Sequence, residues 1–294
     1  MQHITPHLWF NTQAKEAAEL YTSLMPDSKI TRVSTIKDTP SGDCDIVAFT
    51  LAGLDMIAIS AGPYFKMNPS ISLFVTFDNE TEIQNAWNAL CNGGKVLMEF
   101  QEYPWAKKYG WVQDKYGLSW QLSWSEHHNM AQRVTPLLMF TQEHAGQARE
   151  AIGYYMDVFP NAKTDMLVPY GKDEGDVEGY LKHARFSLHG QNFLAMDSSA
   201  KHEFTFNEAV SLIVHCDTQQ DIDHYWKKLS AVPEAEQCGW CKDKFGVSWQ
   251  IVPTAMNEMM ASGTPEQVAR VTKAFMQMKK FDIDTLQRAY DGQT

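Results

Sequence analysis

Two cysteines in the second half of the chain stand at a spacing that can support chemistry. Residues 238–250 read CGWCKDKFGVSWQ, so Cys238 and Cys241 form a C-x-x-C pair. Such a pair can act as a redox dithiol or supply half of a zinc site. A reactive pair, however, usually lies at the N-terminus of a helix, where the helix dipole lowers the thiol pKa. The sequence also has no second C-x-x-C to complete a zinc site. We therefore expect neither chemistry here.

The sequence lacks the usual signatures of nucleophilic and nucleotide chemistry. It has no G-x-S-x-G elbow, no Walker phosphate loop and no G-x-G-x-x-G after a strand. The last absence argues against a Rossmann-type site, and with it against S-adenosylmethionine-dependent methyl transfer. Several histidines fall in a predicted linker or on a predicted helix, where we expect surface residues: His127, His128 and His144.

The bulk composition excludes several classes of protein. With 294 residues, 44% hydrophobic content and a net charge of −11, the chain can build substantial cores but offers no basic surface for nucleic acid. No apolar run approaches the roughly 20 residues that cross a bilayer, and the N-terminus MQHITPHLWF lacks a signal-peptide pattern. Five scattered cysteines indicate reduced thiols. We expect a cytoplasmic protein that binds neither nucleic acid nor membrane.

The chain repeats itself once. YGWVQDKYGLSWQL at 109–122 returns as CGWCKDKFGVSWQI at 238–251, and ITPHLWF at 4–10 returns as VTPLLMF at 134–140. Further matches keep the same order with small changes in length. Because such repetition marks duplicated structural units, we predict four segments. They are a first unit at 1–126, a linker at 127–133, a second unit at 134–254 and a tail at 255–294.

The repeat also bears on the cysteine pair. Cys238 and Cys241 take the places of Tyr109 and Val112, so the unit needs no thiols there. The segment is predicted to be a strand, in which residues three apart point to opposite faces and cannot readily share a disulfide or a metal ion.

Each unit is predicted to hold two β-α-β-β-β modules, which gives four modules in the chain. In the first unit, apolar spacing over 13–24 indicates a helix that Pro26 ends. Asn79 with Glu82 resembles a capping box for a second helix. The predicted strands of this unit are 4–10, 30–36, 46–52, 55–60, 71–77, 95–100, 109–113 and 118–124.

The tail has a different pattern from the repeats. Thr264-Pro265-Glu266-Gln267 forms a capping box with proline at the first helical position. Apolar residues from 268 to 278 then follow one helical face, and a second short helix is predicted over 283–290. We expect these helices to pack on the second unit or on a partner subunit, with methionines 256, 259 and 260 filling gaps beneath them.

The repeated segments resemble the PhnB-like branch of the vicinal oxygen chelate superfamily, which includes glyoxalases, bleomycin-resistance proteins and dioxygenases. That branch often carries the label 3-demethylubiquinone-9 3-methyltransferase-like. The matching residues are TPHLWF, GPYFKMNPSISLFV (62–75), both GW-x-x-DK-[YF]-G-x-S-W-Q segments and the tail 270–292. The resemblance implies an α+β fold of tandem glyoxalase-like units, each with two modules that form a curled mixed sheet shaped like a cup.

The resemblance also implies a divalent metal in the cup of active members, held by side chains from the first and last strands of the modules. The most recognisable ligand is a glutamate, and this chain has Gln121 and Gln250 at the corresponding positions. In the first strand His7 is a candidate ligand, but its counterpart is Leu137. The fourth strand offers Asp197, where the first unit has Ser60.

The strands that start the second module of each unit add no His or Glu, because their candidates are Ser70, Ser72, Ala209 and Ser211. The best partial ligand sets are thus His7 with Gln121, and Asp197 with Gln250. Neither reaches the three strong ligands that a catalytic metal usually has, so we expect no conventional metal cofactor. A divalent metal at His7 and Gln121 stays open as the alternative.

Two tryptophans are candidates for pocket walls. Trp9 and Trp105 lack aromatic counterparts in the second unit, whereas Trp120 belongs to the repeated motif and is expected in a core or interface. Because strand residues alternate, Gln121 should point away from Trp120. The full set of predicted ligand-binding residues is His7, Trp9, Trp105, Gln121, Asp197 and Gln250.

Three functions are compatible with these residues. The first is a metal-free protein that binds an apolar or aromatic small molecule in a cup lined by aromatic and amide groups. The second is a divalent-metal enzyme for isomerisation, ring cleavage or addition. The third is a pseudo-dimer within one chain, in which one cup or neither is functional; a homodimer also stays open. The ligand positions favour the first or the third.

Overall fold

The computed structural model describes residues 3–39, 41–124 and 132–293. Most of the predicted linker, including His127 and His128, therefore lies outside the described residues. None of the described helices is long and apolar enough to cross a membrane.

The first and second units are named repeat 1 and repeat 2, and repeat 1 folds into two modules close to their predicted bounds. Module 1 consists of β1 (Ile4–Phe10), α1 (Ala14–Ser23), β2 (Lys29–Thr39), β3 (Gly42–Leu51) and β4 (Leu54–Ser60). Module 2 consists of β5 (Ile71–Phe77), α2 (Glu80–Cys91), β6 (Lys95–Tyr103), β7 (Ala106–Gln113) and β8 (Ser119–Trp124). The Asn79 side chain accepts a hydrogen bond from the backbone N–H of Glu82, so the predicted N-cap of α2 is confirmed.

Repeat 2 follows the same plan with one departure. Module 3 consists of β9 (Val134–Phe140), η1 (Gln142–His144), α3 (Ala148–Val158), β10 (Lys163–Pro169), β11 (Leu181–Leu188) and β12 (Gln191–Asp197). Module 4 consists of β13 (Val210–Cys216), α4 (Gln219–Leu229), η2 (Pro233–Ala235), β14 (Trp240–Lys242) and β15 (Ser248–Pro253). The prediction of three strands after the helix is wrong for module 4. Residues 230–239 are too few to form both a further strand and the connection that would lead the chain back to the next strand. A short 3₁₀ turn lies in this segment instead.

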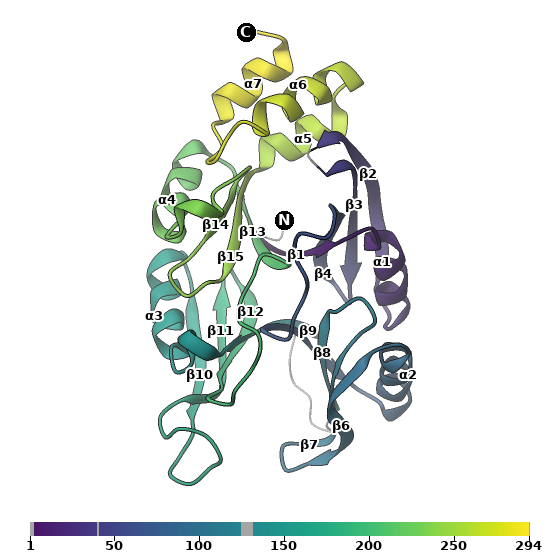
Figure 1. The fold of residues 1–294 in the computed structure, drawn as a ribbon, viewed down its shortest axis with the longest axis vertical. Coiled ribbons are helices and arrows are strands. Elements are labelled where there is room, and N and C mark those ends of the chain that lie inside the picture. The colour runs from purple at the N-terminus through teal and green to yellow at the C-terminus, as the bar shows by residue number, and fades with distance from the viewer. Residues whose placement is uncertain (1–2, 40, 125–131, 294) are drawn as a thin grey trace.

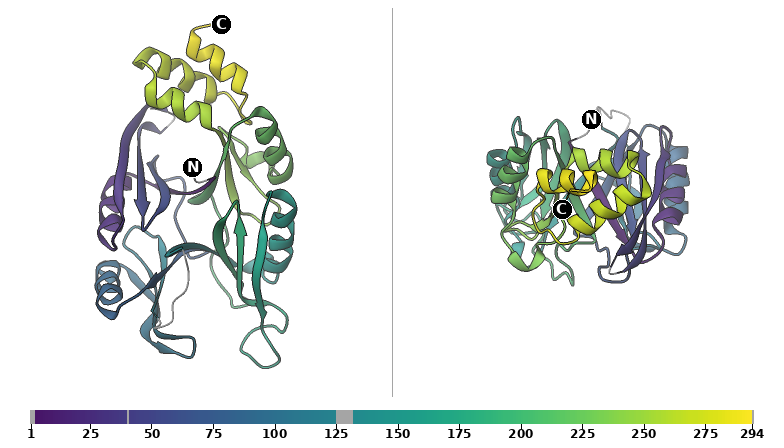
Figure 2. Two further views of the ribbon diagram at one scale, coloured as in Figure 1. Left: turned by 180° about the vertical axis from the view of Figure 1, so that it is seen from behind. Right: turned by 90° about the horizontal axis from the view of Figure 1, so that it is seen from above.

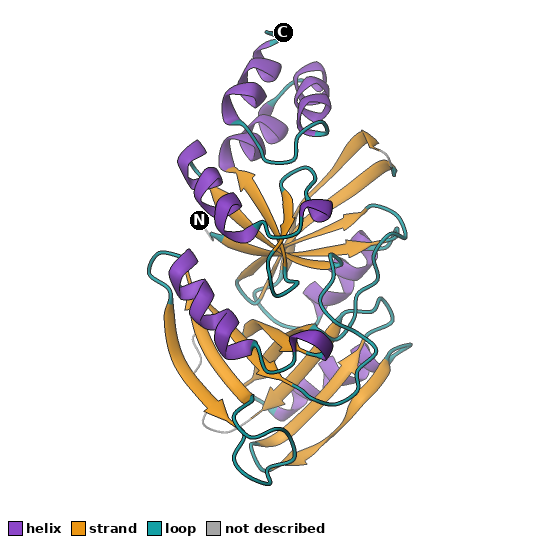
Figure 3. Cartoon of the chain, turned by 60° about the vertical axis from the view of Figure 1, so that its left-hand side comes forward, coloured by secondary structure: helices purple, strands orange, loops and turns teal. Residues whose placement is uncertain are grey.

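The strands form two curled mixed sheets, and each sheet combines one module from each repeat (Figures 1 and 3). The seven-stranded sheet has the order β14-β15-β13-β1-β4-β3-β2, which joins modules 1 and 4. The eight-stranded sheet has the order β10-β11-β12-β9-β5-β8-β7-β6, which joins modules 2 and 3. The seams are antiparallel: His7 pairs with Ser211 between β1 and β13, and Leu137 pairs with Ser72 between β9 and β5.

The alternation of side chains decides which residues face the helices. In β1, Ile4, Leu8 and Phe10 enter the core beneath the helices, so His7 and Trp9 point to the opposite, concave face. The same rule holds in β8, where Trp120 is fully buried in the helix-side core and Gln121 faces the other way. The predicted orientation of this pair is confirmed.

A buried aspartate fixes each repeated turn, and in repeat 2 it also joins the two modules. In repeat 2, Asp243 Oδ1 accepts backbone N–H groups of Phe245 and Val247 at 2.9 and 3.0 Å. Its Oδ2 accepts Trp249 Nε1–H at 2.8 Å and the hydroxyl of Tyr155, on α3, at 2.7 Å. One carboxylate thus fixes the turn, the following strand and a helix of the neighbouring module.

Repeat 1 has an equivalent turn, whose aspartate bonds within module 2. Asp114 accepts two backbone N–H groups of its turn and the indole N–H of Trp120 at 2.9 Å. The helix contact is repeated on the surface, because Glu16 on α1 binds Lys115 at 2.9 Å and Glu150 on α3 binds Lys244 at 2.7 Å. The sheets therefore join modules across repeats, and the turns join modules within a repeat, which closes a ring of four modules.

The tail forms α5 (Thr254–Ser262), α6 (Pro265–Phe275) and α7 (Ile283–Asp291), which lie across one end of the seven-stranded sheet (Figures 1 and 2). The predicted capping box of Thr264 and Gln267 is present. Val271, Phe275 and Met259 pack against Ile213 and Val252 of that sheet. Ile36 and Ile57 of module 1 join the same cluster, so the tail covers both halves of the sheet and not the second unit alone.

The tail also changes the conformation of the C-x-x-C segment. Cys238 lies in a left-handed turn (φ 50°), outside β14, where its backbone N–H donates to the Met278 carbonyl at 2.8 Å. The expected strand therefore begins only at Trp240, because the tail takes up the backbone groups of Cys238 and Gly239. Both cysteines of the pair are free thiols, and burial raises the pKa of each.

The turn aspartate predicts a strong mutational effect. Asp243→Asn places an amide N–H₂ where two donors now point, so we expect the free energy of unfolding to fall by about 2–4 kcal/mol. Denaturant unfolding followed by circular dichroism measures this change. The matched control is Asp157→Asn, at an exposed position of α3. Equal stability of the two variants would contradict the role assigned to the turn carboxylate.

Candidate functional site

The concave faces of the two sheets are named here cup A, for the seven-stranded sheet, and cup B, for the eight-stranded sheet. Because the sheets join modules across repeats, the predicted residues are grouped differently from the expected sets. His7 and Gln250 lie together in cup A, whereas Gln121 lies in cup B. The structure does not bring His7 to Gln121, nor Asp197 to Gln250.

Cup A holds a short chain of polar groups at its centre. Gln250 Nε2 donates to Ser211 Oγ at 2.9 Å, and Ser211 Oγ lies 3.5 Å from His7 Nδ1. All three side chains are buried, with exposed fractions of 7%, 0% and 5%. Burial lowers the pKa of His7 to about 3, so the imidazole is neutral at physiological pH. With the Ser211 hydroxyl accepting from Gln250, its own hydrogen is directed to Nδ1, which leaves the imidazole proton on Nε2.

Two atoms of this group remain available to a ligand. Gln250 Oε1 and His7 Nε2 make no hydrogen bond with any residue that the structure describes, and neither atom is fully enclosed. The first is an acceptor and the second, in the tautomer given above, a donor. Cup A therefore offers a ligand one acceptor and one donor, at the two ends of the chain of polar groups that Ser211 connects.

Aromatic rings line cup A next to the polar group. The ring of Trp240 meets His7 edge-on at 5.4 Å between centroids, and Trp9 meets Trp240 at 6.1 Å. Phe65, from the loop between β4 and β5, continues the wall at 5.0 Å from Trp9. Such an apolar wall around a few convergent polar atoms is typical of a small-molecule site.

Cup B has the same plan, but its polar atoms satisfy one another. Gln121 Oε1 accepts the hydroxyl of Tyr109 at 2.8 Å, and Gln121 Nε2 donates to Ser72 Oγ at 3.4 Å. Leu137 stands where cup A has His7 and packs with Met139 and Leu194. Cys238 occupies the position that corresponds to Tyr109, and its thiol lies instead beside Met276 of the tail. Gln121 therefore has a partner for its carbonyl oxygen that Gln250 lacks.

The other predicted site residues lie elsewhere. Asp197 accepts backbone N–H groups of Gly146, Ala148 and Leu181 at 2.8–3.0 Å, so its carboxylate anchors the start of α3. Burial nevertheless raises the pKa of Asp197. Trp105 is 63% exposed and stacks on Tyr103 at the end of the β6–β7 hairpin. As ligand-binding residues, both stay predictions.

Sequence reasoning undervalued two members of the site. Ser211 is a weak metal ligand by residue type, yet it connects Gln250 to His7. Trp240 belongs to the repeated GW-x-x-DK motif, and its ring forms the wall beside His7. The signal that could have found both is alternation: Trp240 shares the face of Gln250 across β14 and β15, and Ser211 shares the face of His7 across β1 and β13.

The donor set of cup A does not fit a conventional divalent-metal centre. It consists of one imidazole and one amide oxygen, both neutral, whereas such centres usually have three donors that include carboxylate or further imidazole. Within the described ranges, no three His, Cys, Asp or Glu side chains come together in a way that could hold a metal ion.

The fold defines the class of protein. Paired βαβββ-type modules in two curled mixed sheets are the architecture of the vicinal oxygen chelate superfamily. A family model described as 3-demethylubiquinone-9 3-methyltransferase matches the chain twice, at residues 2–123 and 132–252, so the chain belongs to that family. A search of curated proteins finds no match.

Several solved structures are similar to this chain. A PhnB protein from Bacillus cereus is 36% identical over 42% of this chain and 100% of its own, with a TM-score of 0.40. Glyoxalase I from Zea mays matches 88% of this chain and 97% of its own at 11% identity, with a TM-score of 0.55. A Bacillus subtilis protein solved as a candidate dioxygenase matches 96% of this chain and 94% of its own at 10% identity and a TM-score of 0.50. The last two likenesses concern the fold alone.

The pKa of His7 predicts a pH dependence of stability. Its folded pKa of about 3 lies below the unfolded value of 6.5, so between these values the unfolded chain binds a proton that the folded chain does not. Stability should therefore fall as pH falls, by about 2 kcal/mol between pH 6.5 and pH 4.5 from this group. Denaturant unfolding at both pH values should show a smaller loss in His7→Gln than in the wild type.

The matched control for this experiment is His144→Gln, on the η1 segment outside both cups. It should keep the pH dependence that His7→Gln reduces. Parallel pH profiles for the wild type and His7→Gln would contradict a neutral, buried His7.

Proposed function

We propose that the protein binds a small, mainly aromatic molecule carrying one hydroxyl or similar polar group, and that it does so in cup A. The observation that carries this proposal is the difference between two matched glutamines. Gln121 Oε1 is satisfied by Tyr109, whereas Gln250 Oε1 has no partner among the described residues. A ligand hydroxyl can donate to Gln250 Oε1 and accept from His7 Nε2, with its ring against Trp9 and Trp240.

Desolvation makes this pair of groups selective. A ligand that covers Gln250 Oε1 and His7 Nε2 without bonding to them removes both atoms from water at a cost in free energy, so an apolar ligand without a hydroxyl would be disfavoured. The same burial keeps His7 neutral, which suits a neutral hydroxyl better than an anion. The site thus favours an uncharged ligand, held by two hydrogen bonds within an aromatic wall.

Cup B is proposed to have a structural role. Its glutamine, serine and tyrosine side chains bond to one another, and Leu137 removes the donor that His7 provides in cup A. In this account the duplicated chain acts as a pseudo-dimer with one ligand-binding cup. The tail closes one end of that cup by covering Ile213 and Val252.

The family description names a methyltransferase, but we propose no methyl transfer for this chain. The sequence has no glycine-rich turn between a strand and a helix of the kind that binds nucleotide cofactors. A metal-dependent reaction finds no support either, because cup A has only two neutral donors beyond the serine hydroxyl. Binding without chemistry is the function that the donor set supports best.

Titration with 1-naphthol, a neutral bicyclic aromatic with one hydroxyl, tests the site. Gln250→Leu removes the acceptor in cup A, and we expect the dissociation constant measured by calorimetry to rise about tenfold, the value of one hydrogen bond. His7→Leu, which copies cup B, should have a similar effect. Gln121→Leu is the matched control in cup B and should bind like the wild type. Weakening by Gln121→Leu equal to that by Gln250→Leu would refute cup A as the site.

A further inference from the structure

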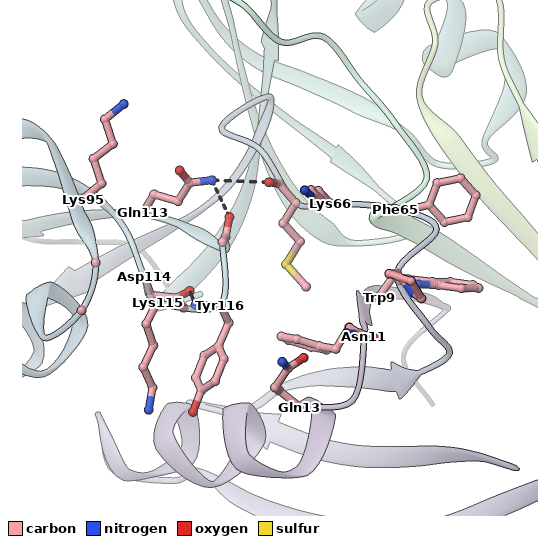
Figure 4. A pocket seen from close by; sticks show the side chains of 16 residues that line it. Trp9, Asn11, Gln13, Phe65, Lys66, Lys95, Gln113, Asp114, Lys115 and Tyr116 are labelled. Carbon is pink, nitrogen blue, oxygen red and sulfur yellow. Dashed lines mark hydrogen bonds between the residues drawn. The ribbon is translucent and has the colours of Figure 1, made fainter. Parts of the chain in front are cut away.

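A pocket of about 470 Å³ lies at the junction between the two modules of repeat 1 (Figure 4). Four connections supply most of its walls: residues 11–13 before α1, 63–67 before β5, 93–94 before β6 and 114–117 between β7 and β8. Trp9 and Phe65, which also belong to the aromatic wall of cup A, form its boundary on that side. Neither the cup A group nor the fold requires this space.

The equivalent junction of repeat 2 is built differently. The connection between β9 and α3 spans 141–147, whereas the connection between β1 and α1 spans only 11–13. The extra residues form η1 and bring in His144. A Cβ built on Gly246 would lie 3.1 Å from His144 Nε2, so this side chain packs directly on the turn. Repeat 1 has no residue at the corresponding place.

A second difference enlarges the space in repeat 1. Asn68 and Asn207 occupy equivalent positions, because each donates its side-chain N–H to the loop of the other repeat, at Thr205 O and Lys66 O. The preceding residues, Met67 and Phe206, are therefore counterparts. Phe206 is 5% exposed and packs edge-on against Phe140 at 5.1 Å. Repeat 1 has the thinner Met67 there, which lines the open pocket.

The charge around this pocket is opposite to that of the whole chain. Three lysines stand among its lining residues, Lys66, Lys95 and Lys115, although the chain has a net charge of −11. The single acidic lining residue, Asp114, is buried and committed to its turn and to Trp120. Lys115 is paired with Glu16, but Lys66 and Lys95 form no ion pair with a described residue.

Aromatic and amide groups complete the lining. Trp9 and Phe65 offer ring faces and edges, and Met67 offers a polarizable thioether that packs well on aromatic rings. Gln113 Nε2 donates to the carbonyls of Met67 and Gly117, at 3.4 and 2.8 Å, and so fixes the opposite walls (Figure 4). Gln13 Nε2 makes no hydrogen bond among the described residues and is a free donor.

We propose that this junction pocket is a second ligand site, separate from cup A, and that it takes a small aromatic carboxylate. The ring would lie between Trp9, Phe65 and Met67, and the carboxylate would meet Lys66 and Lys95 at the rim. The two sites therefore differ in charge preference: cup A takes a neutral hydroxyl compound, and the junction pocket takes an anion. Repeat 2 has no such site, because His144 and Phe206 fill the space.

Calorimetric titration of the full chain with 1-naphthoate, against the neutral 1-naphthamide, tests the proposal. The wild type should bind the carboxylate about tenfold more tightly than the amide, and added salt should reduce this preference. The double variant Lys66→Gln/Lys95→Gln should lose most of the preference for the carboxylate over the amide. Lys172→Gln, at an exposed position of repeat 2, should keep this preference. Met67→Phe, which copies repeat 2, should abolish binding of the carboxylate.

Two further variants distinguish a loss of ligand binding in this pocket from misfolding and from changes in cup A. Asn11→Trp fills the pocket from the opposite wall and should also abolish binding, with circular dichroism confirming the fold of both filled variants. His7→Leu should bind 1-naphthoate like the wild type. The proposal is overturned if the wild type fails to bind the carboxylate at millimolar concentration or shows no preference over the amide. It is equally overturned if both folded filled variants still bind, or if His7→Leu loses binding.

Discussion

The structure depends on one buried carboxylate in each repeated turn. Asp243 accepts four hydrogen bonds from its own turn, from Trp249 and from Tyr155 on another module. A buried charge without such partners would cost several kcal/mol, so the surrounding donors and the aspartate require one another. In repeat 2 this contact joins modules 3 and 4, which no sheet connects, and in repeat 1 the ion pair of Lys115, next to Asp114, with Glu16 reaches from module 2 to module 1. These turns help to close the ring of four modules that holds the two cups in place.

Ring closure across repeats also makes the cups unequal. Each cup receives one module from each repeat, so a change in one module affects only one cup. His7 from module 1 meets Ser211 and Gln250 from module 4, while Leu137 from module 3 meets Ser72 and Gln121 from module 2. The tail adds to the difference by turning Cys238 away from Gln250. The polar groups of one cup thus keep atoms free for a ligand, while those of the other cup bond to one another.

Local patterns in the sequence predicted most elements, but not how they pair. Capping residues such as Asn79 and Thr264 and the alternation around Gln121 act over a few residues, and the structure confirms them. The side chains that lie with His7 in cup A could not be predicted from such local patterns. Gln121 and Gln250 sit in nearly identical motifs, and only the antiparallel seam between β1 and β13 selects Gln250. The absence of a third strand after the helix of module 4 was equally hard to predict. The sequence repeat favours that strand, and only the short length of 230–239 excludes it.

The central claim is that cup A binds ligands through neutral hydrogen-bonding groups and not through a metal. The most direct measurement is the metal content of protein purified without chelator and then incubated with Ni²⁺, Mn²⁺, Zn²⁺ or Fe²⁺. After gel filtration, mass spectrometry of the elements should find well under about 0.1 equivalent per chain, because one imidazole and one amide make a weak site. About one equivalent that disappears in His7→Leu would contradict the account.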